Sequence, residues 1–137
     1  MGQFLAIACG GALGACCRYA VARWVQRSSL FAEGPFSGLA GEPFPWGTVM
    51  VNLSGCLLIG LAAGLLMRPE VSTSWRAFLL VGFLGSYTTF STFSYETLAL
   101  LRAGDTLAAF ANGAGAPILG VLGVWLGDIV ARALSGS

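Results

Sequence analysis

The sequence has no histidine and no lysine, and charged residues make up only 9% of its 137 residues. Histidine is the commonest general base and metal ligand in proteins, so its absence argues against most enzymes. Soluble domains carry roughly 25% charged residues, far more than this chain does. The net charge of +1 provides no basic surface for nucleic acid. These absences indicate a membrane protein.

In place of charged residues, the chain has long apolar runs. Apolar residues make up 56% of it, and the mean hydropathy is +0.79. A helix needs about 20 apolar residues to cross the hydrocarbon core, and four stretches are long enough, at about 4–25, 47–67, 77–101 and 106–127. The sequence therefore predicts an all-α integral membrane protein, with residues 1–137 as one transmembrane domain in contact with lipid.

Arginines are divided evenly between the two sides of such a four-helix arrangement. The side with the termini carries Arg68, Arg76 and Arg132, and the other side carries Arg23, Arg27 and Arg102. The positive-inside rule then favours neither orientation. Either the chain inserts both ways and opposite copies form an antiparallel dimer, or Arg18 or another factor fixes one orientation.

Glycines recur four residues apart in three of the expected helices. The pairs are Gly10 with Gly14, Gly60 with Gly64, and Gly123 with Gly127. This spacing lets helix backbones approach closely in lipid. The contacts are either within one chain or between two copies. Because four helices enclose little interior, we favour a dimer.

The third stretch has a polar centre. From Gly85 to Glu96 it reads GSYTTFSTFSYE, with six Ser or Thr hydroxyls. This density predicts a helix broken at mid-membrane, where irregular backbone must be buried in protein or line a cavity. Carbonyls freed at a break can coordinate a cation. An unbroken helix with a polar packing face is the alternative.

Several side chains in these spans have a structural and a functional interpretation. Phe90 and Phe93 share a helix face, and their rings either pack or turn electropositive edges toward an anion. The Asn52 amide donates two hydrogen bonds, to another helix or to a ligand, and Thr48 lies one turn earlier. Glu96 is an intramembrane ionisable group and hence a functional candidate.

Three segments resemble the Fluc/CrcB family of fluoride channels. They are GGALGACCRY at 10–19, WGTVMVNLSG at 46–55 and GFLGSYTTFSTFSYET at 82–97. The last resembles the family's most diagnostic stretch, its broken third helix. The resemblance covers nearly the whole chain. It implies an antiparallel, dual-topology homodimer with two separate fluoride pores, in a bacterial plasma or inner membrane.

The resemblance also implies roles for individual positions. Phe90 and Phe93 match the two pore phenylalanines, and Asn52 matches the pore asparagine. Gly85 and Thr88 match two positions whose backbone carbonyls hold a structural sodium ion at the dimer centre. Polar pore-side groups of the family fall at Thr48, Ser91, Thr92 and Glu96. Arg18 matches a family arginine with a structural role.

The sequence departs from the family pattern in the fourth helix and in the first loop. Ala116 and Pro117 stand where the family often has a serine, and Asn112, about one turn earlier, is a candidate substitute. Tyr87 stands where a smaller or aliphatic residue is more usual. The loop at 26–46 is long for the family.

The function that the resemblance implies is passive export of fluoride, which lowers its cytoplasmic concentration. The alternative is a small dual-topology multidrug or cation exporter. That function calls for a carboxylate in the first helix, where this sequence has Arg18. A membrane scaffold without transport is a third hypothesis, and it leaves the clustered hydroxyls unexplained. Whether the dimer partner is a second copy or a paralogous chain stays open.

Overall fold

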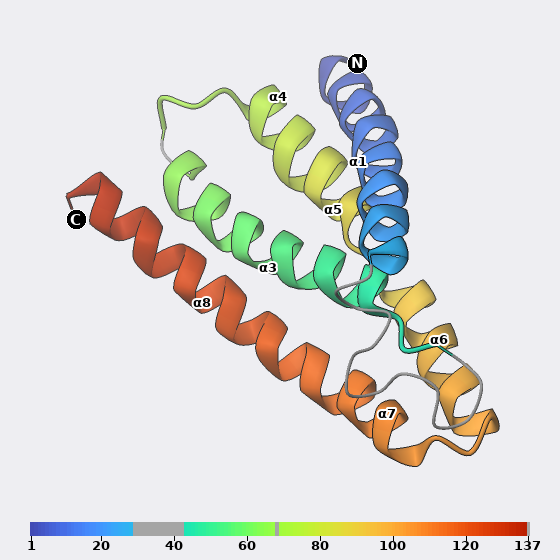
Figure 1. The fold of residues 1–137 in the computed structure, drawn as a ribbon. Coiled ribbons are helices and arrows are strands. Elements are labelled where there is room, and N and C mark those ends of the chain that lie inside the picture. The colour runs from blue at the N-terminus through green and yellow to red at the C-terminus, as the bar shows by residue number, and fades with distance from the viewer. Residues whose placement is uncertain (29–42, 68, 137) are drawn as a thin grey trace.

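The computed structural model describes residues 1–28, 43–67 and 69–136, which form helices and no strand. Figure 1 shows their arrangement. In chain order the elements are α1 (Gly2–Arg27), α3 (Trp46–Leu66), α4 (Thr73–Arg76), η1 (Ala77–Leu84), α5 (Gly85–Tyr87), α6 (Phe90–Arg102), α7 (Thr106–Phe110), η2 (Ala111–Gly115) and α8 (Ala116–Ser135).

Four helical stretches are long and apolar enough to cross a membrane, as the sequence predicted. They are Gly2–Arg27, Trp46–Leu66, Thr73–Arg102 and Thr106–Ser135. The third joins α4, η1, α5 and α6, and the fourth joins α7, η2 and α8. Both η elements are wide, π-type turns, which occur often at functional sites.

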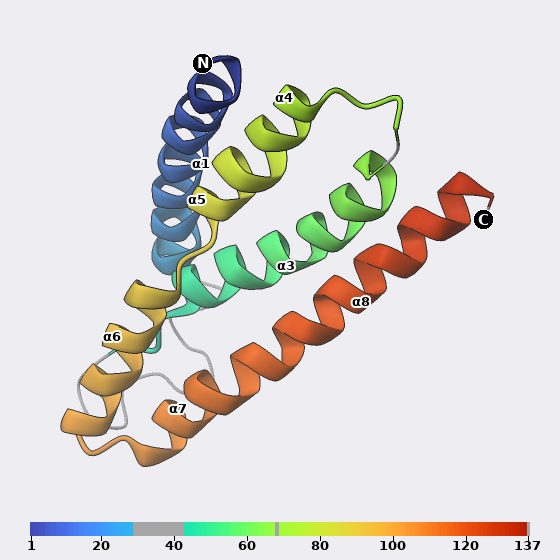
Figure 2. The same cartoon turned by 180° about the vertical axis from the view of Figure 1, so that it is seen from behind.

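The helices pack in two pairs, α1 against α4–η1–α5 and α3 against α8 (Figures 1 and 2). Glycines set both contacts. A Cβ atom on Gly14 would lie 2.1 Å from the Phe83 carbonyl oxygen, and one on Gly60 would lie 2.1 Å from that of Val124. The glycine pairs therefore make contacts within one chain, which is one of the two alternatives that their spacing left open.

The backbone is extended at two residues between α5 and α6. Thr88 has φ −80° and ψ 155°, and Thr89 has φ −146° and ψ 121°. The Thr89 hydroxyl accepts a hydrogen bond from the Thr92 N–H at 3.4 Å, the capping bond that Thr makes at a helix N-terminus. Figure 2 shows the narrow connection that results.

Gln26 joins the end of α1 to the start of α3. Its Nε2 donates to the Phe44 carbonyl at 3.1 Å, and its Oε1 accepts from the Gly47 N–H at 3.0 Å. This side chain thus satisfies a backbone N–H at the start of α3, where Pro45 provides no cap. Most of the long loop expected at 26–46 lies outside the described residues.

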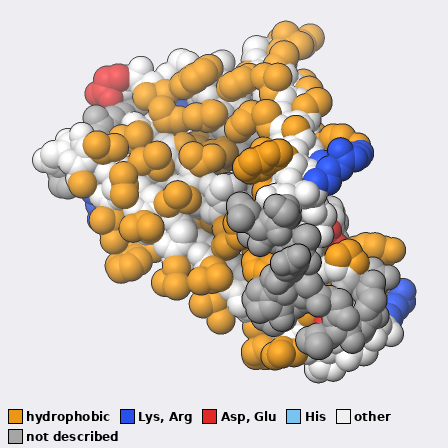
Figure 3. Space-filling model, viewed as in Figure 1, with side chains coloured by type: hydrophobic (Ala, Val, Ile, Leu, Met, Phe, Trp, Pro, Cys, Tyr) orange, Lys and Arg blue, Asp and Glu red, His pale blue; other side chains and the backbone are white. Residues whose placement is uncertain are grey.

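Large apolar side chains cover much of the outer surface, as Figure 3 shows for one face. Phe4 is 79% exposed on α1 and Val121 is 70% exposed on α8. In water such a surface would drive aggregation, whereas in a bilayer it contacts lipid or a second protein.

We expect Gly60→Ala to lower the free energy of unfolding by about 1–3 kcal/mol, because the new methyl group meets backbone that cannot move aside. Gly115→Ala is the matched control, since a Cβ atom there meets nothing within 4 Å. SDS titration in micelles, followed by tryptophan fluorescence, measures both. Equal effects of the two substitutions would contradict the packing described here.

Candidate functional site

The Asn52 amide on α3 binds the extended backbone between α5 and α6. Its Nδ2 donates to the Thr89 carbonyl at 3.1 Å, and its Oδ1 accepts from the Thr89 N–H at 2.8 Å. One side chain thus satisfies both backbone groups of a residue outside the helices, which lipid cannot do. The second N–H of the amide has no partner among the described residues and remains able to donate.

A cavity of about 400 Å³ adjoins this contact. Asn52, Phe90 and Phe93 line it together with Ala116 and Pro117 at the start of α8. The two phenylalanine ring centroids lie 5.8 Å apart, and the rings are tilted by 36°. Three residues that were singled out from the sequence therefore meet at one cavity.

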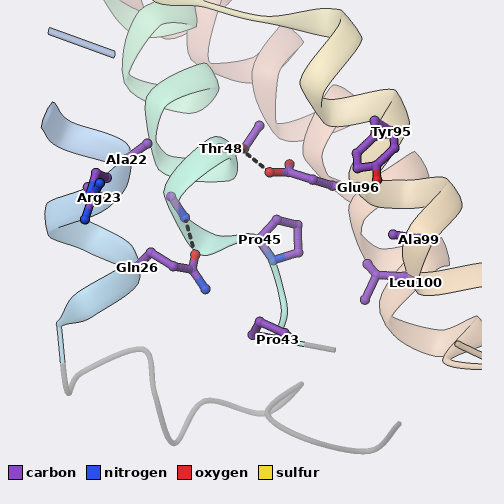
Figure 4. A pocket seen from close by; sticks show the side chains of 11 residues that line it. Ala22, Arg23, Gln26, Pro43, Pro45, Thr48, Tyr95, Glu96, Ala99 and Leu100 are labelled. Carbon is purple, nitrogen blue, oxygen red and sulfur yellow. Dashed lines mark hydrogen bonds between the residues drawn. The ribbon is translucent and has the colours of Figure 1, made fainter. Parts of the chain in front are cut away.

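Thr48 and Glu96 line a second cavity, of about 390 Å³, together with Arg23, Gln26 and Tyr95. Figure 4 shows Thr48 and Glu96 pointing toward each other from α3 and α6. The Thr48 hydroxyl donates to Glu96 Oε1 at 2.8 Å. Glu96 Oε2 is buried and has no partner within the described residues, so it remains free to accept a proton or a hydrogen bond.

Ser91 and Thr92 belong to neither set of lining residues. Both are exposed on the first turn of α6. The Thr92 hydroxyl accepts a hydrogen bond from the Thr89 hydroxyl at 3.1 Å. Within one chain, then, the candidate pore residues form two cavity groups and an exposed pair.

Gly85 and Thr88 lie just before or within the two extended residues and share one feature of their backbone. In a continuous helix their carbonyls would accept from the N–H groups of Thr89 and Thr92, four residues on. Those two N–H groups instead bond to Asn52 Oδ1 and to the Thr89 hydroxyl. Neither carbonyl oxygen therefore has the N–H partner that a continuous helix would give it. Oxygen atoms of this kind are suitable ligands for a hard cation.

Comparison with known proteins places the chain in a family. The model for the family described as CrcB-like protein, Camphor Resistance (CrcB), matches residues 5–128. The chain belongs to the CrcB family. It is therefore a multi-pass membrane protein, in agreement with its four long apolar helices.

Three similar proteins align with this CrcB chain over most of their length. It is 44% identical over 128 residues to a protein of Stutzerimonas stutzeri, covering 93% of this chain and 94% of that protein. It is 42% identical over 134 residues to one of Thermus thermophilus, covering 98% and 97%. A third, from Acidobacterium capsulatum, is 41% identical over 129 residues, covering 93% and 94%. Each is named fluoride-specific ion channel FluC.

Two features of this CrcB chain were not evident from the sequence. Cys56 lines the cavity beside Asn52, and the only available signal was its position one turn further along α3. Asn112, the candidate substitute for a pore serine, is not among the lining residues and is 0% exposed. It donates to the Thr97 hydroxyl at 2.8 Å instead.

Proposed function

We propose that this chain is a fluoride-selective channel that lets fluoride leave the cell passively. The observation that carries the proposal is the meeting of Asn52, Phe90 and Phe93 at one cavity beside the extended residues Thr88 and Thr89. Its relatives named fluoride-specific ion channel support it at 41–44% identity over nearly the full length. They also favour it over the multidrug or cation exporter and give no support to an enzyme.

Fluoride is small and strongly hydrated, so a selective pore must replace its water with hydrogen-bond donors while still releasing the ion. The free N–H of Asn52 supplies such a donor, and the edges of Phe90 and Phe93 supply weaker electropositive contacts. A second polar site is provided by Thr48, one turn before Asn52 on α3, and by its hydrogen-bond partner Glu96 on α6. Ser91 and Thr92 contribute hydroxyls from the exposed face of α6.

The membrane potential is sufficient to drive export. An elementary charge that crosses 100 mV gains about 2.3 kcal/mol. An interior-negative potential therefore expels the anion and lowers cytoplasmic fluoride without an energy-coupling domain. In this proposal residues 1–137 form a single channel domain in the bacterial plasma or inner membrane.

The chain works as an antiparallel, dual-topology homodimer in this proposal, with its third helix interrupted at mid-membrane. The carbonyls of Gly85 and Thr88 support a structural sodium ion at the dimer centre. One chain offers two such oxygens, and a second copy would complete a ligand set of four. The ion would neutralise carbonyl dipoles that the interruption leaves unpaired.

We expect liposomes that contain the purified protein and a potassium ionophore to release fluoride fast and chloride negligibly. Phe93→Ile should slow fluoride release at least about tenfold, which corresponds to roughly 1.4 kcal/mol of barrier, because the ring edge is lost. Phe110→Ile is the matched control, since Phe110 is exposed on α7 and lines neither cavity. No fluoride release from a folded wild type would reject the proposed function.

The dimer and its ion are tested by light scattering and by unfolding in matched sodium and choline salts. The expected protein mass is twice 14.1 kDa. Sodium should stabilise the protein by about 2.7 kcal/mol when its concentration is one hundred times the dissociation constant of the sodium site. A monomer in both salts would contradict the dimer, and identical unfolding in both would contradict the ion.

A further inference from the structure

A partly buried chain of two hydrogen bonds connects the fourth membrane span to Phe93. Asn112, in η2, donates through Nδ2 to the Thr97 hydroxyl at 2.8 Å. The Thr97 hydroxyl in turn donates to the Phe93 carbonyl at 2.8 Å. The chain thus ends on the backbone of a residue whose ring lines the cavity beside Asn52.

Phe90 provides an internal comparison. Its carbonyl also accepts from a hydroxyl one turn later, that of Ser94, at 2.9 Å. Ser94 is exposed, however, and its hydroxyl bond stays within α6. Of the two phenylalanines, it is Phe93 whose hydroxyl bond continues to another helix.

Asn112 is costly as a packing residue. It is 0% exposed, and its Oδ1 has no partner among the described residues. A buried polar atom without a partner destabilises a fold, whereas an apolar side chain of similar size carries no such cost. The benefit of Asn112 must then come from its donor group, which bonds to Thr97.

Three side chains on other elements bind α6 or its capping residue. Asn52 binds Thr89 and Thr48 binds Glu96, both from α3. Asn112 supplies the bond from the span that contains α8, and α8 lines the same cavity through Ala116 and Pro117. Gly113 permits the close approach, since a Cβ atom there would lie 3.2 Å from Thr97 Cγ2.

We propose that Asn112, acting through Thr97, is a positioning residue that fixes Phe93 relative to α8 and so sets the width of the permeation cavity. Neither side chain lines that cavity, so neither contacts the ion there. This inference rests on the proposed fluoride channel.

The test compares four single variants and one double variant, Asn112→Leu with Thr97→Val, with the wild type in liposomes. Asn112→Leu removes the first bond of the chain, Thr97→Val removes both, and Thr97→Ser retains both. Ser135→Ala is the matched control, since it removes an equivalent hydroxyl bond to the carbonyl four residues earlier, at the far end of α8. Fluoride and chloride efflux are both measured, together with amide hydrogen exchange over residues 90–102.

Asn112→Leu and Thr97→Val should each lower the fluoride-to-chloride flux ratio by roughly 3- to 10-fold, the scale of one hydrogen bond. Their double variant should be no worse than Thr97→Val, because both act through one chain of bonds. Asn112→Leu and Thr97→Val should both speed amide hydrogen exchange in the first turns of α6. Thr97→Ser and Ser135→Ala should keep the wild-type ratio.

A wild-type flux ratio in Asn112→Leu would overturn the positioning role and leave the channel intact. An equal loss of the flux ratio in Ser135→Ala would also overturn the positioning role, because the effect would then be unspecific. A folded wild type that releases no fluoride would reject the proposed function and this inference together. Unchanged exchange in α6 for both Asn112→Leu and Thr97→Val would reject the inference independently of any flux.

Discussion

The rest of the structure depends on the two hydrogen bonds between the Asn52 amide and the backbone of Thr89. Each unsatisfied backbone group costs several kcal/mol in lipid, so extended residues inside a membrane span need a protein partner. Asn52 provides one donor and one acceptor for Thr89. The contact lets α6 begin anew at Phe90, places both phenylalanines at the cavity, and diverts an N–H group from the Gly85 carbonyl.

Close helix contacts at glycine residues fix the helix arrangement in which the Asn52–Thr89 contact forms. Because α3 approaches α8 at Gly60, and α1 approaches η1 at Gly14, the helices stay close without a large apolar core. The outer surface can then remain apolar for lipid or a second copy. Polar groups concentrate along one line of α3, where Thr48 and Asn52 face α6 and its cap.

Hydropathy alone was sufficient to predict the four spanning helices, because insertion into hydrocarbon demands long apolar runs. The density of hydroxyls from Ser86 to Ser94 directed attention to the stretch that holds the two extended residues. Sequence singled out Asn52 as well, but its partner lies 37 residues away and follows only from helix packing. Helix rotation likewise decides that Thr48 and Glu96 line a different cavity from Phe93, and that Asn112 faces Thr97. Glycine spacing is the same for contacts within and between chains, so it left both open.

The most direct test of the account is fluoride efflux through Asn52→Leu, measured together with amide exchange at Thr89. Leucine keeps the branched shape and the number of heavy atoms of the side chain but offers no hydrogen-bond partner for the Thr89 N–H or carbonyl. We expect the Thr89 amide to exchange slowly in the wild type and fast in the variant, and fluoride efflux to be lost together with that protection. A variant that conducts fluoride at the wild-type rate would show that the channel does not depend on this contact.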